Sequence, residues 1–527
     1  MRAAIALIAA AMVASCYATD EETAPALESQ LRWISIDVDA LDTARAIAPI
    51  DSVEVAGNIA LVRFDERDLP SLSRAMHEQH NRCAGFIVHD TYEEGQLALA
   101  AANRDRTADF APAYTIDNAA AVNRLLPALS ESSLLMMIQQ LSENYTSRYY
   151  NTSGGLAVPM WLRDQWAGYA ADRPDVTVEL FTHQGFEQRS VIATITGSTK
   201  PNEVIVIGAH IDSIASGSST APGADDDASG IATISEVLHA LMAKKFRPER
   251  TVKLMAYAAE EIGLKGSKSI VADYVAKGIN VVGVMQFDMT NYKGSPKDIY
   301  LMQDFTNAAQ NTFVGNLIDT YVGATWGTSQ CGYGCSDHAS WHNAGFAASM
   351  PAEATFEDTN PNLHTPNDTL EASNNTATHA LKFARLATAY IAELAKGELM
   401  NAAPVVSITA PGAGETLTGS TPIELDATAM DDEDGELSAS IEWTSSLDGA
   451  LGSGASLKAK LSAGVHTITA TAKDSAGATG EATMSLTITV GDGDDDGGTS
   501  SGCDAGGGSG LAAACASLLA ALRRRRR

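Results

Sequence analysis

The stretch Glu203–Asp212 reads EVIVIGAHID and gives the strongest indication of the fold class. Its apolar, β-branched run is typical of a strand buried on both faces, as in a parallel sheet. The run ends in His210 and Asp212. Ligands bind beyond the carboxyl ends of such strands, so we expect both polar side chains at a functional site.

Further apolar runs follow downstream at Thr251–Ala256 and Val281–Phe287. They alternate with helical patterns such as Ser132–Tyr145 and Ile231–Leu241. This alternation over residues 112–399 predicts an α/β domain with a mixed, mostly parallel twisted sheet and helices on both faces.

Two smaller units flank that domain. Residues 20–111 contain candidate strands at Trp33–Val38 and Asn58–Phe64 around a helical pattern at Leu69–Gln79, which predicts an α+β unit. Residues 402–490 contain short alternating runs separated by Gly, Asp and Ser, which predict an immunoglobulin-like β-sandwich.

Both ends of the chain have the composition of targeting segments. Residues 1–16 combine Arg2, an apolar run and a small-residue region ending in Cys16, as in a secretory signal. Simple cleavage and a lipobox with lipidation of Cys16 both stay open. Residues 491–510 predict an acidic, Gly-rich linker. Residues 511–527, an apolar run before five arginines, resemble the sorting tails of myxobacterial surface proteins. We expect a secreted protein, or one attached to the outer membrane or cell surface.

The charge balance excludes one class of partner. Acidic residues outnumber basic ones 65 to 36, which gives a net charge of -29 over 527 residues. Such a chain repels a phosphate backbone, so we expect no nucleic-acid partner.

Carboxylates follow two further strand-like runs. Glu260 and Glu261 directly follow Val252–Ala259, and Asp288 follows Val281–Phe287. Adjacent carboxylates at the end of a buried strand are unfavourable unless a charge compensates them, as a metal ion does. One glutamate can bind the metal while the other accepts a proton from an activated water.

Two loops supply the remaining candidates. The acidic triplet Asp225–Asp227 stands in a Gly- and Pro-rich loop, where a carboxylate between two cations would bridge them, and His364 stands in the stretch PNLHTPND. With His210, these segments offer a histidine, aspartate, glutamate, aspartate and histidine, a ligand set suited to two zinc ions. Asp212 is placed to accept the second ring N–H of His210.

Four stretches of the α/β domain resemble the M28 metallopeptidase family, and in particular the secreted leucine aminopeptidases of Vibrio. They are Ala221–Gly230, Met255–Ser267, Asp288–Ser295 and Cys331–Gly345. The resemblance covers about residues 112–399 and implies cleavage at the N-termini of peptides or proteins by a monomeric catalytic domain.

The resemblance also implies a role for each site residue. Asp226 would bridge two zinc ions, Glu260 would be the general base, and Tyr333 would stabilise the oxyanion. The other ligands would be His210 and Asp288 at one ion and Glu261 and His364 at the other.

The same resemblance describes the substrate pocket. Cys331 and Cys335 would form a disulfide at its border. Ala352 and Thr359 stand where aromatic residues are expected, which predicts a wider pocket with a preference for bulky apolar residues. The matching lining positions are Met289, Cys331, Cys335, Met350, Phe356 and Leu363.

The N-terminal unit would be a pro-domain that blocks the site until it is removed; the alternative is a permanent accessory domain. Its residues 77–80 read HEQH, one residue short of the HExxH zinc motif. His338 and His342 have no glutamate in the required place, so we interpret them as packing and hydrogen-bonding residues.

Two other functions share parts of this pattern. Two-zinc carboxypeptidases and deacylases use similar ligands, and they differ in whether a blocked substrate N-terminus is tolerated. A surface adhesin without activity is the other alternative, and the presence of every ligand and of Glu260 argues against it.

Overall fold

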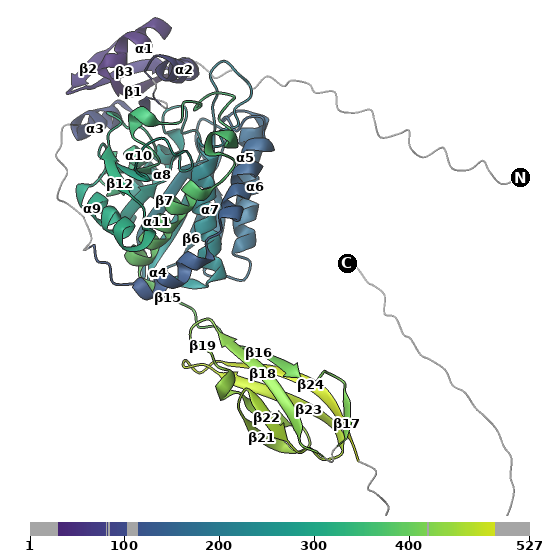
Figure 1. The fold of residues 1–527 in the computed structure, drawn as a ribbon. Coiled ribbons are helices and arrows are strands. Elements are labelled where there is room, and N and C mark those ends of the chain that lie inside the picture. The colour runs from purple at the N-terminus through teal and green to yellow at the C-terminus, as the bar shows by residue number, and fades with distance from the viewer. Residues whose placement is uncertain (1–29, 81, 83–84, 103–113, 419–420, 491–527) are drawn as a thin grey trace, which may run out of the picture. The chain divides into compact units, whose positions relative to one another are not determined.

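The computed structural model describes residues 30–80, 82, 85–102, 114–418 and 421–490 (Figure 1). The chain forms two compact units, Met1–Met400 and Asn401–Arg527. The predicted signal segment, acidic linker and sorting tail lie outside the described residues.

A six-stranded mixed sheet forms the centre of the first unit, in the order β13-β10-β7-β9-β6-β5. Its neighbouring strands β10, β7 and β9 are parallel, β13 continues parallel to β10, and β6 and β5 are antiparallel. The predicted mixed α/β fold is therefore confirmed. The strands are β5 (Val176–Phe181), β6 (Ser190–Ile195), β7 (Lys200–His210), β9 (Arg250–Tyr257), β10 (Asn280–Gln286) and β13 (Ala348–Ser349).

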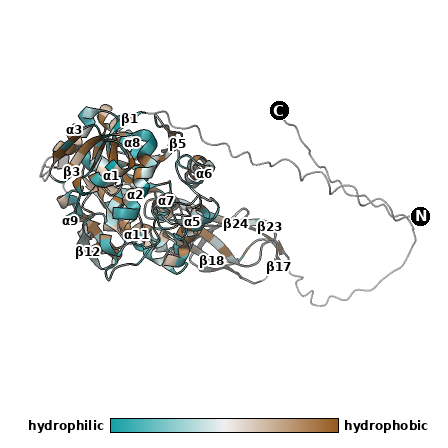
Figure 2. Ribbon diagram, turned by 90° about the horizontal axis from the view of Figure 1, so that it is seen from above, coloured by the Kyte–Doolittle hydropathy of each residue, from teal (hydrophilic) through white to brown (hydrophobic). Residues whose placement is uncertain are grey.

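Helices cover both faces of this sheet because successive side chains of a strand point to opposite sides. Ile205 and Ile207 of β7 belong to an apolar cluster with α7 and α11, whereas Val204 and Val206 belong to a second cluster with α8. Figure 2 shows the apolar ribbon in brown and hydrophilic stretches such as those of α8 in teal. The main helices are α5 (Glu131–Glu143), α6 (Ser153–Tyr169), α7 (Ala228–Ala243), α8 (Lys265–Ala276), α10 (His338–Asn343) and α11 (Thr378–Ala395).

An α+β subdomain precedes the large sheet within the same unit. Its antiparallel sheet has the order β2-β3-β1-β4. Helices α1 and α2 share an apolar cluster with this sheet, and α3 packs on β1 and β3. The elements are β1 (Leu31–Asp37), α1 (Leu41–Ile47), β2 (Val53–Ala56), β3 (Ile59–Asp65), α2 (Leu69–His80), β4 (Phe86–His89) and α3 (Tyr92–Ala102). Its role as a pro-domain stays a prediction.

The second unit consists of two β-sheets that share one core containing Leu425, Trp443 and Ile468. One sheet contains β16 (Val405–Ala410), β18 (Ile423–Asp431), β19 (Gly435–Glu436) and β22 (Ser456–Ala459). The other contains β17 (Thr416–Thr418), β24 (Thr479–Thr489), β23 (Gly464–Lys473), β20 (Glu442–Ser445) and β21 (Gly449–Ser453). Its immunoglobulin-like class stays a prediction. Among the described residues, no helix has the length and apolar character needed to span a membrane.

Candidate metal centre

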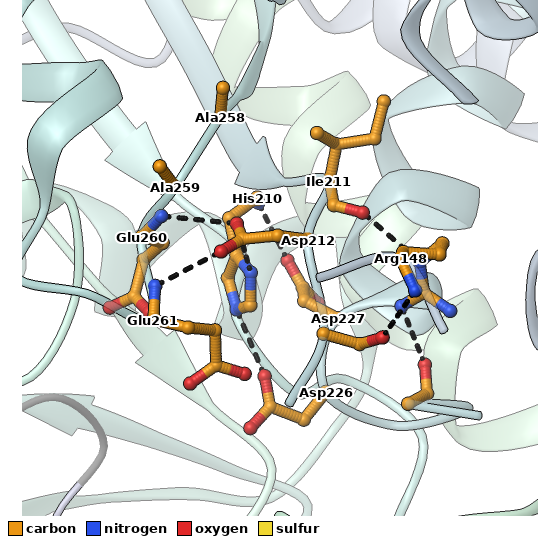
Figure 3. A network of polar contacts seen from close by, with 12 residues as sticks. Arg148, His210, Ile211, Asp212, Asp226, Asp227, Ala258, Ala259, Glu260 and Glu261 are labelled. Atoms are coloured by element: carbon orange, nitrogen blue, oxygen red, sulfur yellow. Dashed lines mark hydrogen bonds and ion pairs between the residues drawn. The ribbon is translucent and has the colours of Figure 1, made fainter. Parts of the chain in front are cut away.

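Three neighbouring parallel strands place polar side chains at one edge of the sheet. His210 is the last residue of β7, Glu260 and Glu261 follow β9, and Asp288 follows β10. The carboxyl ends of parallel strands lie at the same edge. Figure 3 shows His210, Glu260 and Glu261 there, and Asp288 lies beside His210. The sequence predicts that these four residues lie together.

Asp226 lies between two histidines. Its Oδ1 is 2.9 Å from His210 Nε2, and its Oδ2 is 2.8 Å from His364 Nε2. Asp288 Oδ1 lies 3.4 Å from His210 Nε2, and Glu261 Oε2 lies 3.2 Å from His364 Nε2. The five predicted ligands therefore form two groups that share Asp226.

All five side chains are at least 97% buried. His and carboxylate groups are the donors that zinc binds, so their chemistry fits this ion. Asp227 also lies close to His210 and Asp288. However, Asp227 accepts hydrogen bonds from the main-chain N–H groups of His210, Gly230 and Met289. The oxygens of Asp227 are therefore engaged by main-chain donors, whereas those of Asp226 face the two histidines.

Glu260 is 1% exposed, and within the described part of the chain neither of its carboxylate oxygens has a hydrogen-bond partner. Burial raises the pKa of Glu260 well above its usual range, against the opposing charge of His210. Burial also raises the pKa of Glu261 to about 7, with His364 opposing. An isolated buried carboxylate is costly, and a cation at this site removes that cost.

The pKa of Asp226 shifts in the opposite direction from those of Glu260 and Glu261. Burial opposes ionisation of Asp226, but hydrogen bonds with His210 and His364 hold its pKa below the usual range. A carboxylate that stays ionised between two imidazoles is suited to bind two cations.

Three residues with a strained backbone lie at or beside the candidate ligands. Ala259, Met289 and His364 have φ values of 53°, 60° and 54°, in the left-handed region that non-glycine residues rarely adopt. Ala259 precedes Glu260, and Met289 follows Asp288. Such strain commonly occurs at functional sites, where the surrounding structure maintains it.

Several buried residues that the sequence did not reveal hold this site in place. Arg148 is fully buried and donates to the carbonyl oxygens of Ile211 and Gly223, at 3.0 and 2.9 Å (Figure 3). Asp368 accepts the main-chain N–H groups of Asp225 and Asp226, both at 3.1 Å. These contacts fix the loop that contains Asp226. Arg148 carries no sequence signal, whereas Asp368 closes the stretch that includes His364.

The predicted substrate pocket forms a cavity of about 30 Å³. All of the predicted lining residues contribute to it, and Cys331 and Cys335 are bonded with an S–S distance of 2.05 Å. Tyr333 lies in the same wall. Ala352 and Thr359 also line the cavity, as does His77 of α2. The greater width of the pocket stays a prediction.

The N-terminal subdomain meets the site through one face of α2. Ser73 Oγ donates to the main-chain oxygen of Glu261 at 2.7 Å, and the His77 ring lies 4.3 Å from that of His364. Burial lowers the pKa of His77 to about 4, and His364 adds to the effect. His338 is fully buried in α10, which agrees with a packing role, whereas its hydrogen-bonding role stays a prediction.

This site combines histidines and carboxylates at the carboxyl edge of a mixed α/β sheet. Beside them lies Glu260, whose carboxylate has no hydrogen-bond partner among the described residues. This combination is typical of a metal-dependent hydrolase. Residues 190–389 match the profile of Peptidase family M28. A probable aminopeptidase of Saccharomyces cerevisiae is 35% identical over 49% of this chain and 71% of its own length. Leucine aminopeptidase 1 of Arthroderma otae is 36% identical over 54% of this chain and 79% of its own length.

Solved structures agree with these relatives. The LapA aminopeptidase of Legionella pneumophila is 26% identical, with a TM-score of 0.62 over 71% of this chain and 100% of its own. LapB of the same organism is 29% identical, with a TM-score of 0.61 over 70% of this chain and 100% of its own. The chain belongs to peptidase family M28. It is a zinc aminopeptidase of the hydrolase class.

Proposed function

We propose that this chain is an exported two-zinc aminopeptidase that releases apolar residues from the N-termini of peptides or proteins. The observation that carries the proposal is the position of Asp226, with one carboxylate oxygen toward His210 and the other toward His364. One zinc would be held by His210, Asp288 and Asp226, and the other by Glu261, His364 and Asp226. Two zinc ions in these groups would polarise the substrate carbonyl and lower the pKa of a water.

Glu260 has the position and chemistry of the general base. Both of its oxygens are available within the described structure, and the next residue in the chain supplies a ligand. In the proposed reaction Glu260 takes the proton of the attacking water and gives it to the leaving amine. Tyr333 lies in the pocket wall, where its hydroxyl would donate to the developing oxyanion.

The pocket supports a preference for apolar N-terminal residues. Its wall contains Met289, Met350, Phe356 and Leu363, which offer apolar contacts and no charge. The substrate's free amino group would lie beside Glu261 and His364. This arrangement accounts for the removal of one residue at a time.

One assay tests the activity. Purified protein released from its N-terminal subdomain is incubated with leucine anilide and with its acetylated form, before and after chelation, and zinc is then restored. We expect cleavage of the free form alone, loss on chelation and recovery with zinc. Equal cleavage of both forms would indicate a two-zinc carboxypeptidase or deacylase, and activity without zinc would contradict the mechanism.

The N-terminal subdomain supports a role as an inhibitory pro-domain. It contributes His77 to the lining of the substrate pocket. An ion pair also joins Glu66 to Lys265, the first residue of α8. Lys268 pairs with Glu94 of α3 at 2.8 Å. Both ion pairs have side chains that are less than 40% exposed, so solvent screens them only in part.

Cleavage between α3 and α4 (Ala119–Leu125) tests the pro-domain role. A protease site introduced there is cut, and the rate on leucine anilide is compared before and after release of the fragment. We expect activity to rise at least about tenfold because the pocket opens. Unchanged activity would mean that the subdomain is a permanent accessory part.

Export and surface attachment are supported by the sequence at both ends. Mass spectrometry of the mature protein distinguishes cleavage near residue 16 from lipidation of Cys16. It also detects removal of residues 511–527. The second unit would hold the enzyme to a surface or act as a spacer.

A further inference from the structure

One histidine of the N-terminal subdomain lies beside the proposed zinc ligands without an assigned role. The His77 and His364 rings are 4.3 Å apart and inclined by 45°. His77 also lies within electrostatic range of Asp226. The described structure contains no hydrogen bond to the His77 ring, so both ring nitrogens remain available for another interaction.

The helix that contains His77 approaches this site with two consecutive turns of one face. Ser73 and His77 are four residues apart, so their side chains lie one above the other on α2. Ser73 binds the main-chain oxygen of Glu261, and His77 contacts His364. A single helical face therefore touches two of the three residues that would hold the second zinc ion.

The donor set of that second group leaves one zinc coordination position open. Glu261, His364 and the shared Asp226 supply three ligands, whereas structural zinc sites have four and catalytic ones leave a fourth position to water or substrate. Imidazole nitrogen is among the preferred zinc ligands. His77 is the nearby side chain that offers one from outside the catalytic domain.

We propose that His77 binds the second zinc ion as a fourth protein ligand, so that the metal itself holds the N-terminal subdomain on the site. The inference rests on the proposed two-zinc function and deepens it, because the position taken by His77 is the one that the substrate amine or water requires. Closure of the site then depends on zinc. Removal of the metal loosens α2, and release of the subdomain breaks the bond between His77 and zinc.

Cobalt-substituted full-length protein tests the ligation directly. The visible absorption of cobalt responds to a change of ligand, so His77→Gln and His77→Ala should alter the spectrum and weaken binding of the second ion at least about tenfold. The matched control is Glu78→Gln, which changes the adjacent exposed residue of α2 and should leave both unchanged. Spectra and affinities of the His77 variants that equal those of the wild type would overturn the proposal.

Hydrogen exchange of α2 provides a second measurement. In the wild type, zinc should slow exchange of residues 69–80 at least about tenfold relative to the chelated protein. The same slowing in both His77 variants would overturn the proposal. Neither measurement needs a substrate. Dependence on His77 in a protein that cannot cleave leucine anilide even after release of the N-terminal subdomain would refute the activity alone. A released enzyme that is active, from a full-length protein without that dependence, would refute this ligation alone.

Discussion

Asp212 Oδ1 accepts a hydrogen bond from the main-chain N–H of Glu260 over 3.0 Å. Its Oδ2 accepts the N–H of Glu261 at 3.2 Å, and its Oδ1 lies 3.5 Å from His210 Nδ1. The sequence predicts a contact between Asp212 and the His210 ring but gives no sign of the two main-chain contacts. The carboxylate instead connects three site residues, because it lies between the ends of two neighbouring parallel strands.

Replacement of this carboxylate should disturb the whole site. Asp212→Asn keeps the size of the side chain but replaces one acceptor oxygen by an amide that faces a main-chain N–H. We expect zinc affinity to fall by about 10- to 100-fold and activity to fall with it. Chelator competition measures the affinity. Asp164→Asn, at an exposed aspartate, is the control and should bind zinc normally.

Glu260 should be needed for turnover and not for metal content. Glu260→Gln removes the group that accepts a proton, so we expect kcat to fall by about 10²- to 10⁴-fold. Zinc content measured by elemental analysis should be unchanged, and Glu179→Gln, at an exposed position of β5, should retain full activity. Loss of one zinc from the Glu260 variant would show that Glu260 is a ligand instead.

Ala352 should set the size of residue that the pocket accepts. Its side chain lines the cavity and is 3% exposed, so Ala352→Phe adds a ring where the substrate side chain would lie. We expect kcat/KM for leucine and phenylalanine anilides to fall at least about tenfold relative to alanine anilide, after removal of the N-terminal subdomain. Thr359→Val, which nearly conserves volume, should keep the wild-type order. A wild-type preference for charged residues would contradict the apolar assignment.

Acid should destabilise the first unit through a buried histidine. Burial lowers the pKa of His338 from its usual 6.5 to about 3. The unfolded chain therefore binds a proton that the folded chain excludes. The associated stability is fully present above pH 6.5 and is lost progressively as pH falls toward 3, on the order of 3 kcal/mol by about pH 4.

Thermal unfolding between pH 7 and pH 4 measures this effect. His338→Gln should flatten the dependence of the unfolding temperature on pH, whatever its stability at neutral pH. His239→Gln, at a histidine that is 44% exposed, should keep the wild-type slope. An unchanged slope in the His338 variant would show that other groups cause the acid sensitivity.

Local sequence patterns predict the central fold and most residues of the candidate site. The apolar run before His210 predicts a buried parallel strand, and similar runs precede Glu260 and Asp288. Strand polarity then places these residues at one edge without knowledge of any contact. Helix bounds were also close, with α2 predicted over Leu69–Gln79 and observed over Leu69–His80.

The residues from distant segments that complete the site became known from the tertiary structure alone. It separates Asp226 from Asp227, because the oxygens of Asp227 accept main-chain hydrogen bonds and those of Asp226 face two histidines. It also brings His77 to His364, although the local spacing of HEQH excludes the zinc motif. Periodicity reports the neighbours of a residue along its own helix or strand. Contacts between distant segments depend on how whole elements pack, and no local pattern contains that information.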